Sequence, residues 1–239
     1  MFGRRKCLVS CFTMSISVCY SLFCKLNQTN HNHENVYSMD GTDCVMLSGE
    51  TANGPYFEEA VKVMARTCCE AQHSRNYNSL FQSIRNTVIR KTGALSPGES
   101  LASSAVKTAV DIDAKLIVVV SESGNMGRLI AKFRPGRFVI VLTPSDTIAR
   151  QCSGLLTGVR AYAMESTDLE QTEKLVEEVV NEALRVKLVN PGDLMVGVWG
   201  KTHGRGLTDT VRVHICQPSP GGVTNNSSRM NFQFFESTA

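Results

Sequence analysis

The chain has 239 residues, of which 42% are hydrophobic and 20% are charged, and this composition is typical of a globular protein with one or two domains. Its 25 basic and 22 acidic residues give a formal charge of +3 without a long run of one sign, so the charge pattern gives no indication of nucleic-acid binding. The nine cysteines are scattered, with no CxxC pair and no Cys/His ligand spacing. This pattern favours reduced thiols over a disulfide scaffold or a metal site.

Residues 1–39 differ in composition from the rest of the chain. Basic residues at 4–6 precede an uncharged run over 7–24, which imitates the basic and apolar parts of a signal peptide. The run is rich in serine and no small-residue cleavage site follows it, so export or membrane attachment is only a minor alternative. A mispredicted start joined to a truncated gene explains the segment at least as well. Residues 25–38, rich in asparagine, are expected to form a disordered linker.

A second segment begins at Asp40 and is expected to form one strand, one loop and one helix. The apolar residues of 43–47 predict a short strand, and 48–55 predict a polar loop. A helix should follow from Glu58 onward. Its apolar face carries Ala60, Val61, Met64 and Ala65.

The next two elements are helices. Residues 76–90 carry apolar side chains near the 3.6-residue spacing of an amphipathic helix. Ser96, Pro97 and Glu99 then form a helix start, with a serine cap, proline in the first position and glutamate in the third. The side chains expected to face the following strand are Leu101, Ala105, Ala109 and Ile112.

The stretch from Lys115 to Pro135 has the order strand, tight turn, helix. Residues 115–120 are apolar and mostly β-branched, which is typical of a strand covered on both faces of a parallel sheet. The turn that follows consists of Ser121, Glu122, Ser123, Gly124, Asn125 and Met126. Free backbone N–H groups and the positive end of a helix dipole meet there, and this combination suits a phosphate. An ordinary βα turn is the alternative, because the full GxGxxG or GxxxxGK pattern is missing.

Beyond this turn, strands and helices alternate, which predicts an α/β domain with a mainly parallel, five-stranded sheet. The further strands are expected at 138–142, 159–164, 194–199 and 208–215, and the helices at 146–152 and 165–188. The last two strands are joined by a loop too short for a crossover helix, so the last strand should be antiparallel. That loop is either a second phosphate-binding element or an ordinary basic hairpin tip. Its central residues are Lys201, Thr202, His203, Gly204, Arg205 and Gly206.

The string DCVMLSGETA at 43–52, followed by GPY at 54–56 and EAV at 59–61, resembles the last barrel strand and loop of pyruvate kinase. The likeness extends more loosely to about Cys216. It implies a fragment of a TIM barrel followed by the family's C-terminal α/β regulatory domain. The expected organisation is an extension outside the family at 1–39, the barrel remnant at 40–73, the regulatory domain at 74–216 and a disordered tail at 217–239.

The resemblance implies glycolytic phosphoryl transfer from phosphoenolpyruvate to ADP in the cytoplasm. Ser48 matches an active-site serine of the family. The full-length enzymes use Mg²⁺ and K⁺, whose ligands come from barrel strands that do not occur in this sequence, so the isolated chain is expected to be inactive. Two alternatives remain open: a non-enzymatic sugar-phosphate-binding module, and a gene fragment with no independent role.

The same resemblance implies that a sugar bisphosphate, such as fructose 1,6-bisphosphate, binds at 121–126 and 201–206 as an effector. Many effector-responsive members carry an arginine on the long helix where this chain has Leu175, and Met126 replaces a hydroxyl residue. The identity of the effector is therefore left open. A homo-oligomer through the C-terminal domain is also implied, and neither nucleic acid nor a membrane is an expected partner.

Overall fold

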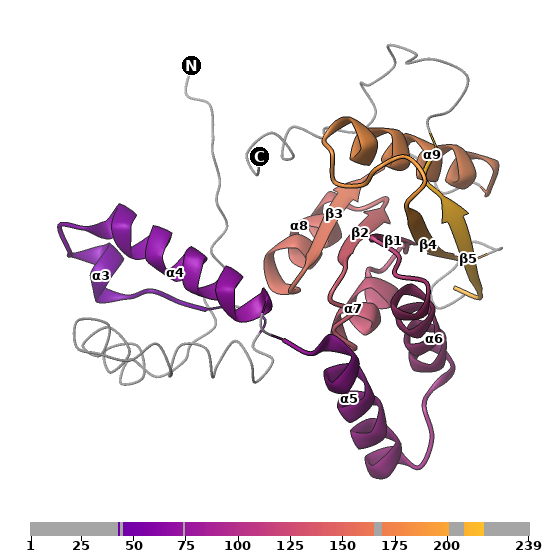
Figure 1. Ribbon diagram of the computed structural model, residues 1–239, viewed down its shortest axis with the longest axis horizontal. Helices are drawn as coiled ribbons and strands as arrows, with labels where there is room; N and C mark the ends of the chain where they lie inside the picture. Colours follow the sequence, from indigo (N-terminus) through magenta and orange to yellow (C-terminus); the bar gives the residue numbers. More distant parts are fainter. Residues whose placement is uncertain (1–42, 44, 74, 165–168, 201–207, 218–239) are drawn as a thin grey trace. The chain divides into compact units, whose positions relative to one another are not determined.

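The computed structural model describes residues 43, 45–73, 75–164, 169–200 and 208–217, which are the coloured parts of Figure 1. The chain divides into two compact units, Met1–Asn76 and Tyr77–Ala239. None of the helices in the described ranges combines the length and the apolar character that crossing a membrane requires. The predictions for the run 7–24 and for the C-terminal tail concern residues outside the described ranges, apart from Gln217 at the start of the tail.

The described residues of the first unit form two helices, α3 (Gly49–Ala52) and α4 (Phe57–His73). The predicted strand at 43–47 is wrong for its described positions 45–47, which have no regular structure. A strand needs a neighbour for its backbone hydrogen bonds, and the described residues of this unit form no other strand. The predicted polar loop instead closes into the turn of α3, where the Ser48 carbonyl accepts the Thr51 and Ala52 N–H groups at 3.2 and 3.0 Å. The helix predicted from Glu58 is confirmed as α4.

The second unit is built on a five-stranded sheet in the order β3-β2-β1-β4-β5. Its strands are β1 (Leu116–Val120), β2 (Phe138–Thr143), β3 (Val159–Ala163), β4 (Leu194–Trp199) and β5 (Thr210–Ile215). β1 pairs in parallel with both β2 and β4, β2 pairs in parallel with β3, and β5 is antiparallel to β4. The predicted mainly parallel sheet with an antiparallel last strand is confirmed.

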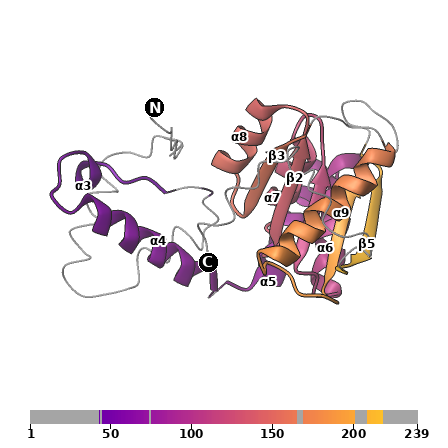
Figure 2. The same ribbon diagram turned by 90° about the horizontal axis from the view of Figure 1, so that it is seen from above.

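Helices cover both faces of this sheet. They are α5 (Tyr77–Thr92), α6 (Pro97–Asp111), α7 (Asn125–Lys132), α8 (Asp146–Leu155) and α9 (Leu169–Arg185). Figures 1 and 2 show α9 on one face and α6 and α7 on the other. The helices match the predicted order, although α8 continues to Leu155 and does not end at Cys152.

Two hydrophobic cores form because successive residues of a strand point to opposite faces. Ile117 and Val119 of β1 face the side of α6 and α7, whereas Leu116 and Val118 face α9, and all four are fully buried. The α9 core includes Val176, Val179 and Ala183. The other core includes Phe81 of α5, whose ring centroid lies 6.0 Å from that of Phe133.

The buried face of α6 differs slightly from the predicted one. Ala105 and Ala109 are buried as predicted, but Leu101 and Ile112 are only half-buried. The remaining fully buried positions are Ala102 and Val106. The spacing of three and four residues is kept, so the correction is a small rotation of the helix about its axis.

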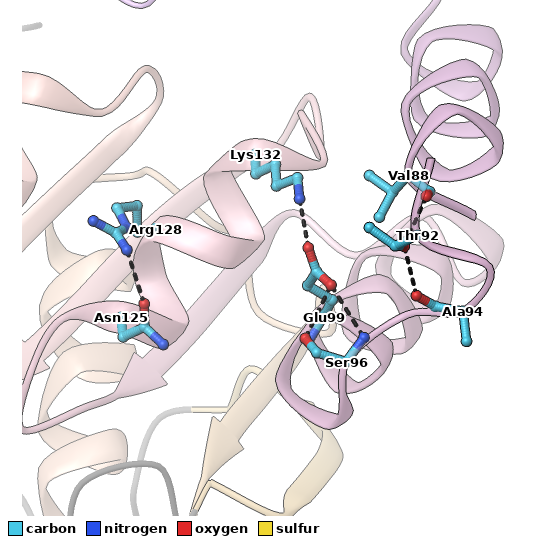
Figure 3. Close-up of polar contacts among 8 residues, drawn as sticks. All are labelled: Val88, Thr92, Ala94, Ser96, Glu99, Asn125, Arg128 and Lys132. Carbon is cyan, nitrogen blue, oxygen red and sulfur yellow. Dashed lines mark hydrogen bonds and ion pairs between the residues drawn. The ribbon is translucent and has the colours of Figure 1, made fainter. Parts of the chain in front are cut away.

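The predicted helix start of α6 is confirmed as a capping box (Figure 3). The Ser96 hydroxyl accepts the Glu99 N–H at 3.3 Å, and the Glu99 carboxylate accepts the Ser96 N–H at 3.1 Å. The same carboxylate accepts a bond from Lys132 Nζ, at the end of α7, at 2.5 Å. The Lys132 bond first, and then the bonds from Ser96, lower the pKa of Glu99 from 4.5 to about 2. Glu99 therefore joins the start of α6 to the end of α7.

Replacing Glu99 by glutamine should lower the free energy of unfolding at neutral pH by about 1 kcal/mol, because the ion pair is lost and the cap is weakened. Since folding lowers the pKa of Glu99, its ionised form stabilises the fold above pH 4.5, and this contribution is lost as the pH falls toward about 2. Urea titrations of both proteins across this pH range should therefore show their stabilities converging on acidification.

The matched control is Asp111→Asn at the other end of α6, where the carboxylate pairs with the exposed Lys107 one turn away. Its effect should be about 0.5 kcal/mol or less. A stability difference between wild type and Glu99→Gln that does not shrink toward low pH would contradict the assigned role of Glu99.

Candidate functional site

The residues predicted to bind phosphate lie where the parallel strands end. β1 and β4 are adjacent and parallel, with Val119 opposite Val198. Ser121 and Gly200 therefore follow the carboxyl ends of neighbouring strands, at the same end of the sheet. After β1, the next two strands in sequence, β2 and β3, are added on one side of β1, whereas β4 and β5 are added on its other side. The strand order reverses at this point, and ligands of open α/β sheets bind in the crevice outside such a reversal.

The loop after β1 exposes some of its predicted site residues and buries others. Ser123 and Asn125 are exposed and Glu122 is half-buried, while Ser121 is buried. Met126 is only 5% exposed and packs in the core on the side of α7. Its side chain is therefore a packing group, and only its backbone N–H is available at the start of the helix.

Gly124 is the residue on which the loop turns into α7. Its φ angle of +69° lies in the left-handed region, which residues other than glycine rarely adopt. A Cβ there would also lie 2.7 Å from Cγ2 of Ile148 and 2.8 Å from Sγ of Cys152, both on α8. Glycine is thus required for its conformation and for its close contact with α8.

Backbone N–H groups converge at the start of α7. The helical bonds begin with the Arg128 N–H, which donates to the Gly124 carbonyl at 3.0 Å. The Asn125 N–H donates to the Ser123 hydroxyl at 3.4 Å. The N–H groups of the first turn have no carbonyl acceptor within their own helix, and the helix dipole places partial positive charge there. This end of α7 favours an anion.

Arg128 is not among the predicted site residues, yet it lies beside the loop. Its guanidinium donates to the side-chain carbonyl of Asn125 at 3.3 Å, and Figure 3 shows the pair at the start of α7. Residues three apart on a helix share a face, and this spacing is the signal that would have included Arg128. Its charge adds to that of the helix dipole.

The neighbouring thiol of Cys152 is a packing group. Burial raises its pKa, and the positive charge of Arg128 opposes this shift without cancelling it. The thiol is therefore neutral at physiological pH. Its role at the site is to support Gly124 from the side of α8.

The loop is also fastened to β2. The Ser121 N–H donates to the Leu142 carbonyl at 2.9 Å, and the Thr143 hydroxyl donates to the Glu122 carbonyl at 3.1 Å. Thr143 is fully buried and is likewise not among the predicted site residues. A threonine that ends an apolar strand is a weak sequence signal, because its hydroxyl has many possible partners.

The remaining predicted residues lie elsewhere. Ser48 is half-buried in the first unit, where its N–H donates to the Glu50 carboxylate at 3.0 Å. Within the described ranges no three His, Cys, Asp or Glu side chains gather as a metal site would require. The other predicted site residues, which lie outside the described ranges, are Lys201, Thr202, His203, Gly204, Arg205 and Gly206.

Comparison with known proteins agrees with this fold. The family described as pyruvate kinase, alpha/beta domain, matches residues 99–214. The cytosolic pyruvate kinase isozyme of Glycine max is 39% identical over 194 residues, which cover 74% of this chain and 36% of that protein. Pyruvate kinase of Candida albicans is 37% identical over 179 residues, covering 73% of this chain and 35% of the relative.

A crystal structure of pyruvate kinase from Cryptosporidium parvum superposes with a TM-score of 0.69 at 33% identity, covering 78% of this chain and 35% of that one. The fold and the position of its loop thus define an open α/β domain of the kind found in a phosphotransferase family. The chain belongs to the pyruvate kinase family. It spans about a third of the length of the curated relatives that it matches, at 36% and 35%.

Replacing Gly124 by alanine should lower the free energy of unfolding by about 2 to 4 kcal/mol, because left-handed backbone strain adds to the clash with α8. Urea denaturation checks this. The control is Gly154→Ala in α8, where no heavy atom lies within 4 Å of the added Cβ, so the change should be neutral or stabilising. Equal stability of Gly124→Ala and wild type would contradict the described loop.

Proposed function

We propose that the second unit is the regulatory domain of a pyruvate kinase and binds a sugar bisphosphate, such as fructose 1,6-bisphosphate. The observation that carries this proposal is the position of the 121–126 loop, at the reversal of strand order and at the positive end of α7. The exposed Ser123 hydroxyl and the backbone N–H groups near Asn125 would bind one phosphate. Arg128 adds a positive charge beside them.

The second phosphate is assigned to the loop after β4, whose basic residues are Lys201, His203 and Arg205. Gly200 leaves the sheet beside Ser121, so this loop begins at the same edge as the first one. Leu175 is half-buried against the α9 core and brings no charge to the ligand. The basic loop is therefore the element that would distinguish a bisphosphate from a monophosphate.

The reaction assigned to the whole protein is the glycolytic transfer of a phosphoryl group from phosphoenolpyruvate to ADP in the cytosol. The similarity to pyruvate kinases, including a cytosolic isozyme, supports it over the two alternatives left open by the sequence. Mg²⁺ and K⁺ in the full-length enzyme would neutralise the charge of the phosphoryl group. No three His, Cys, Asp or Glu side chains gather among the described residues, and no catalytic step is assigned to them. The residue of this chain that we assign to the active site of the full-length enzyme is Ser48, by its resemblance to the family's active-site serine.

The 239-residue polypeptide by itself is expected to be inactive, because a single serine cannot hold the metal or stabilise the transferred phosphoryl group. The measurement is pyruvate formation coupled to lactate dehydrogenase, with Mg²⁺ and K⁺ present and a full-length pyruvate kinase as the positive control. Turnover that rises in proportion to the concentration of the purified chain would refute the expectation.

Ser123→Asp should weaken the binding of fructose 1,6-bisphosphate by at least about a hundredfold, because a negative charge replaces a phosphate-binding hydroxyl. Calorimetry on the full chain measures the affinity. A second readout is the fluorescence of Trp199, the single tryptophan, which ends β4 directly before the basic loop.

The control is Ser104→Asp, which makes the same change on the exposed side of α6 and should leave the affinity unchanged. If Ser123→Asp binds as tightly as wild type, Ser123 does not contact the phosphate. The loop would then be an ordinary turn.

Self-association through β5 is the expected mode of assembly. This strand is at the edge of the sheet, and among the described strands it pairs with β4 alone, so its other side could pair with a strand of a second copy. Val213 and Ile215 are about half exposed, at 49% and 56%. An apolar edge strand of this kind supports pairing between two copies of the chain.

A further inference from the structure

The β1–α7 loop is shaped by a residue outside it. Thr143 is the last residue of β2 and is fully buried. Its hydroxyl donates to the Glu122 carbonyl at 3.1 Å and accepts the Ser145 N–H at 3.5 Å. A buried hydroxyl is costly unless it is hydrogen-bonded, so the Thr143 hydroxyl holds the Glu122 carbonyl in one direction.

The direction of that carbonyl fixes the next amide. No peptide bond in the described chain is cis, and in a planar trans peptide the C=O and N–H point in opposite directions. Because the Glu122 carbonyl points to Thr143 on β2, the Ser123 N–H must point away from β2. The adjacent ladder bond, from the Ser121 N–H to the Leu142 carbonyl, holds the preceding residue. The Ser123 amide therefore has a fixed orientation before any ligand binds.

The end of the loop at Gly124 is held by packing against α8. Gly124 lies against Ile148 and Cys152 of α8, with no room for a Cβ. Ser145, the residue whose N–H donates to Thr143, is the N-cap of the same helix, and its hydroxyl accepts the Ile148 N–H at 3.4 Å. Residues 121–124 thus contact the end of β2 through hydrogen bonds and α8 through the packing of Gly124.

We propose that Thr143 is a positioning residue for the effector site: its hydroxyl orients the Glu122–Ser123 peptide so that the loop's N–H groups are preorganised for a phosphate. This inference rests on the proposed function of the loop. Binding to a preorganised loop avoids the entropic cost of ordering it, so loss of the hydroxyl lowers affinity without removing any group that touches the ligand.

The test compares Thr143→Val, which keeps the shape but removes the hydroxyl, with Thr143→Ser, which keeps the hydroxyl. Calorimetry with fructose 1,6-bisphosphate on the full chain should show affinity falling about tenfold in Thr143→Val and recovering in Thr143→Ser. Amide hydrogen exchange of residues 121–126 without ligand should be faster in Thr143→Val than in the other two proteins. All measurements are made well below the melting temperature of each variant.

The control for a merely structural role is Ser153→Ala. The Ser153 hydroxyl accepts the Ala161 N–H at 2.8 Å and so joins the same helix, α8, to β3. Its loss should lower stability comparably without changing the affinity. If Ser153→Ala weakens binding as much as Thr143→Val, the effect is one of general stability and the positioning role is overturned.

Two further outcomes are distinguishable. If wild type binds the bisphosphate and Thr143→Val binds it equally well, the positioning role fails and the proposed function stands. If wild type does not bind the bisphosphate, the proposed function fails, and the role of Thr143 fails with it.

Discussion

The hydrogen bonding of β1 on both of its edges is the constraint on which the rest of the second unit depends. β1 pairs in parallel with β2 and with β4, and four of its five residues are fully buried. A strand in this position cannot move without breaking two ladders and both cores. The loop that follows it is therefore anchored to the central strand of the sheet, at the point where the strand order reverses.

The helix after that loop is anchored at both ends. Gly124 at its start is set against α8, and Lys132 at its end is paired with Glu99 of α6. The first contact is made by packing and the second by an ion pair, so they respond differently to mutation and to pH. Together they hold the N–H groups of the first turn of α7 in place, which is what anion binding at a helix start requires.

Much of this arrangement could be predicted from the sequence, because local patterns determine it. Uninterrupted apolar residues identify β1, the spacing of Ser96 and Glu99 identifies the capping box, and a short connection makes β5 antiparallel. The strand predicted at 43–47 failed because pairing with a neighbour, and not residue type, decides whether a strand forms.

The candidate site was only partly predictable for a related reason. Ser123 and Gly124 lie in a recognisable turn, whereas Thr143 becomes relevant only when β2 is placed beside β1. Met126 has the expected position in sequence, but its side chain is taken up by the core. Contacts between elements that are distant in the chain thus decide which side chains face a ligand.

The most direct test of the central claim is a two-dimensional amide NMR titration of the isotope-labelled full chain with fructose 1,6-bisphosphate. The account predicts that the largest shift changes occur in the loop after β1, from Ser121 to Gly127, and in the segment that begins at Gly200. Saturable changes confined to other parts of the chain, or no changes at a large excess of ligand, would contradict it.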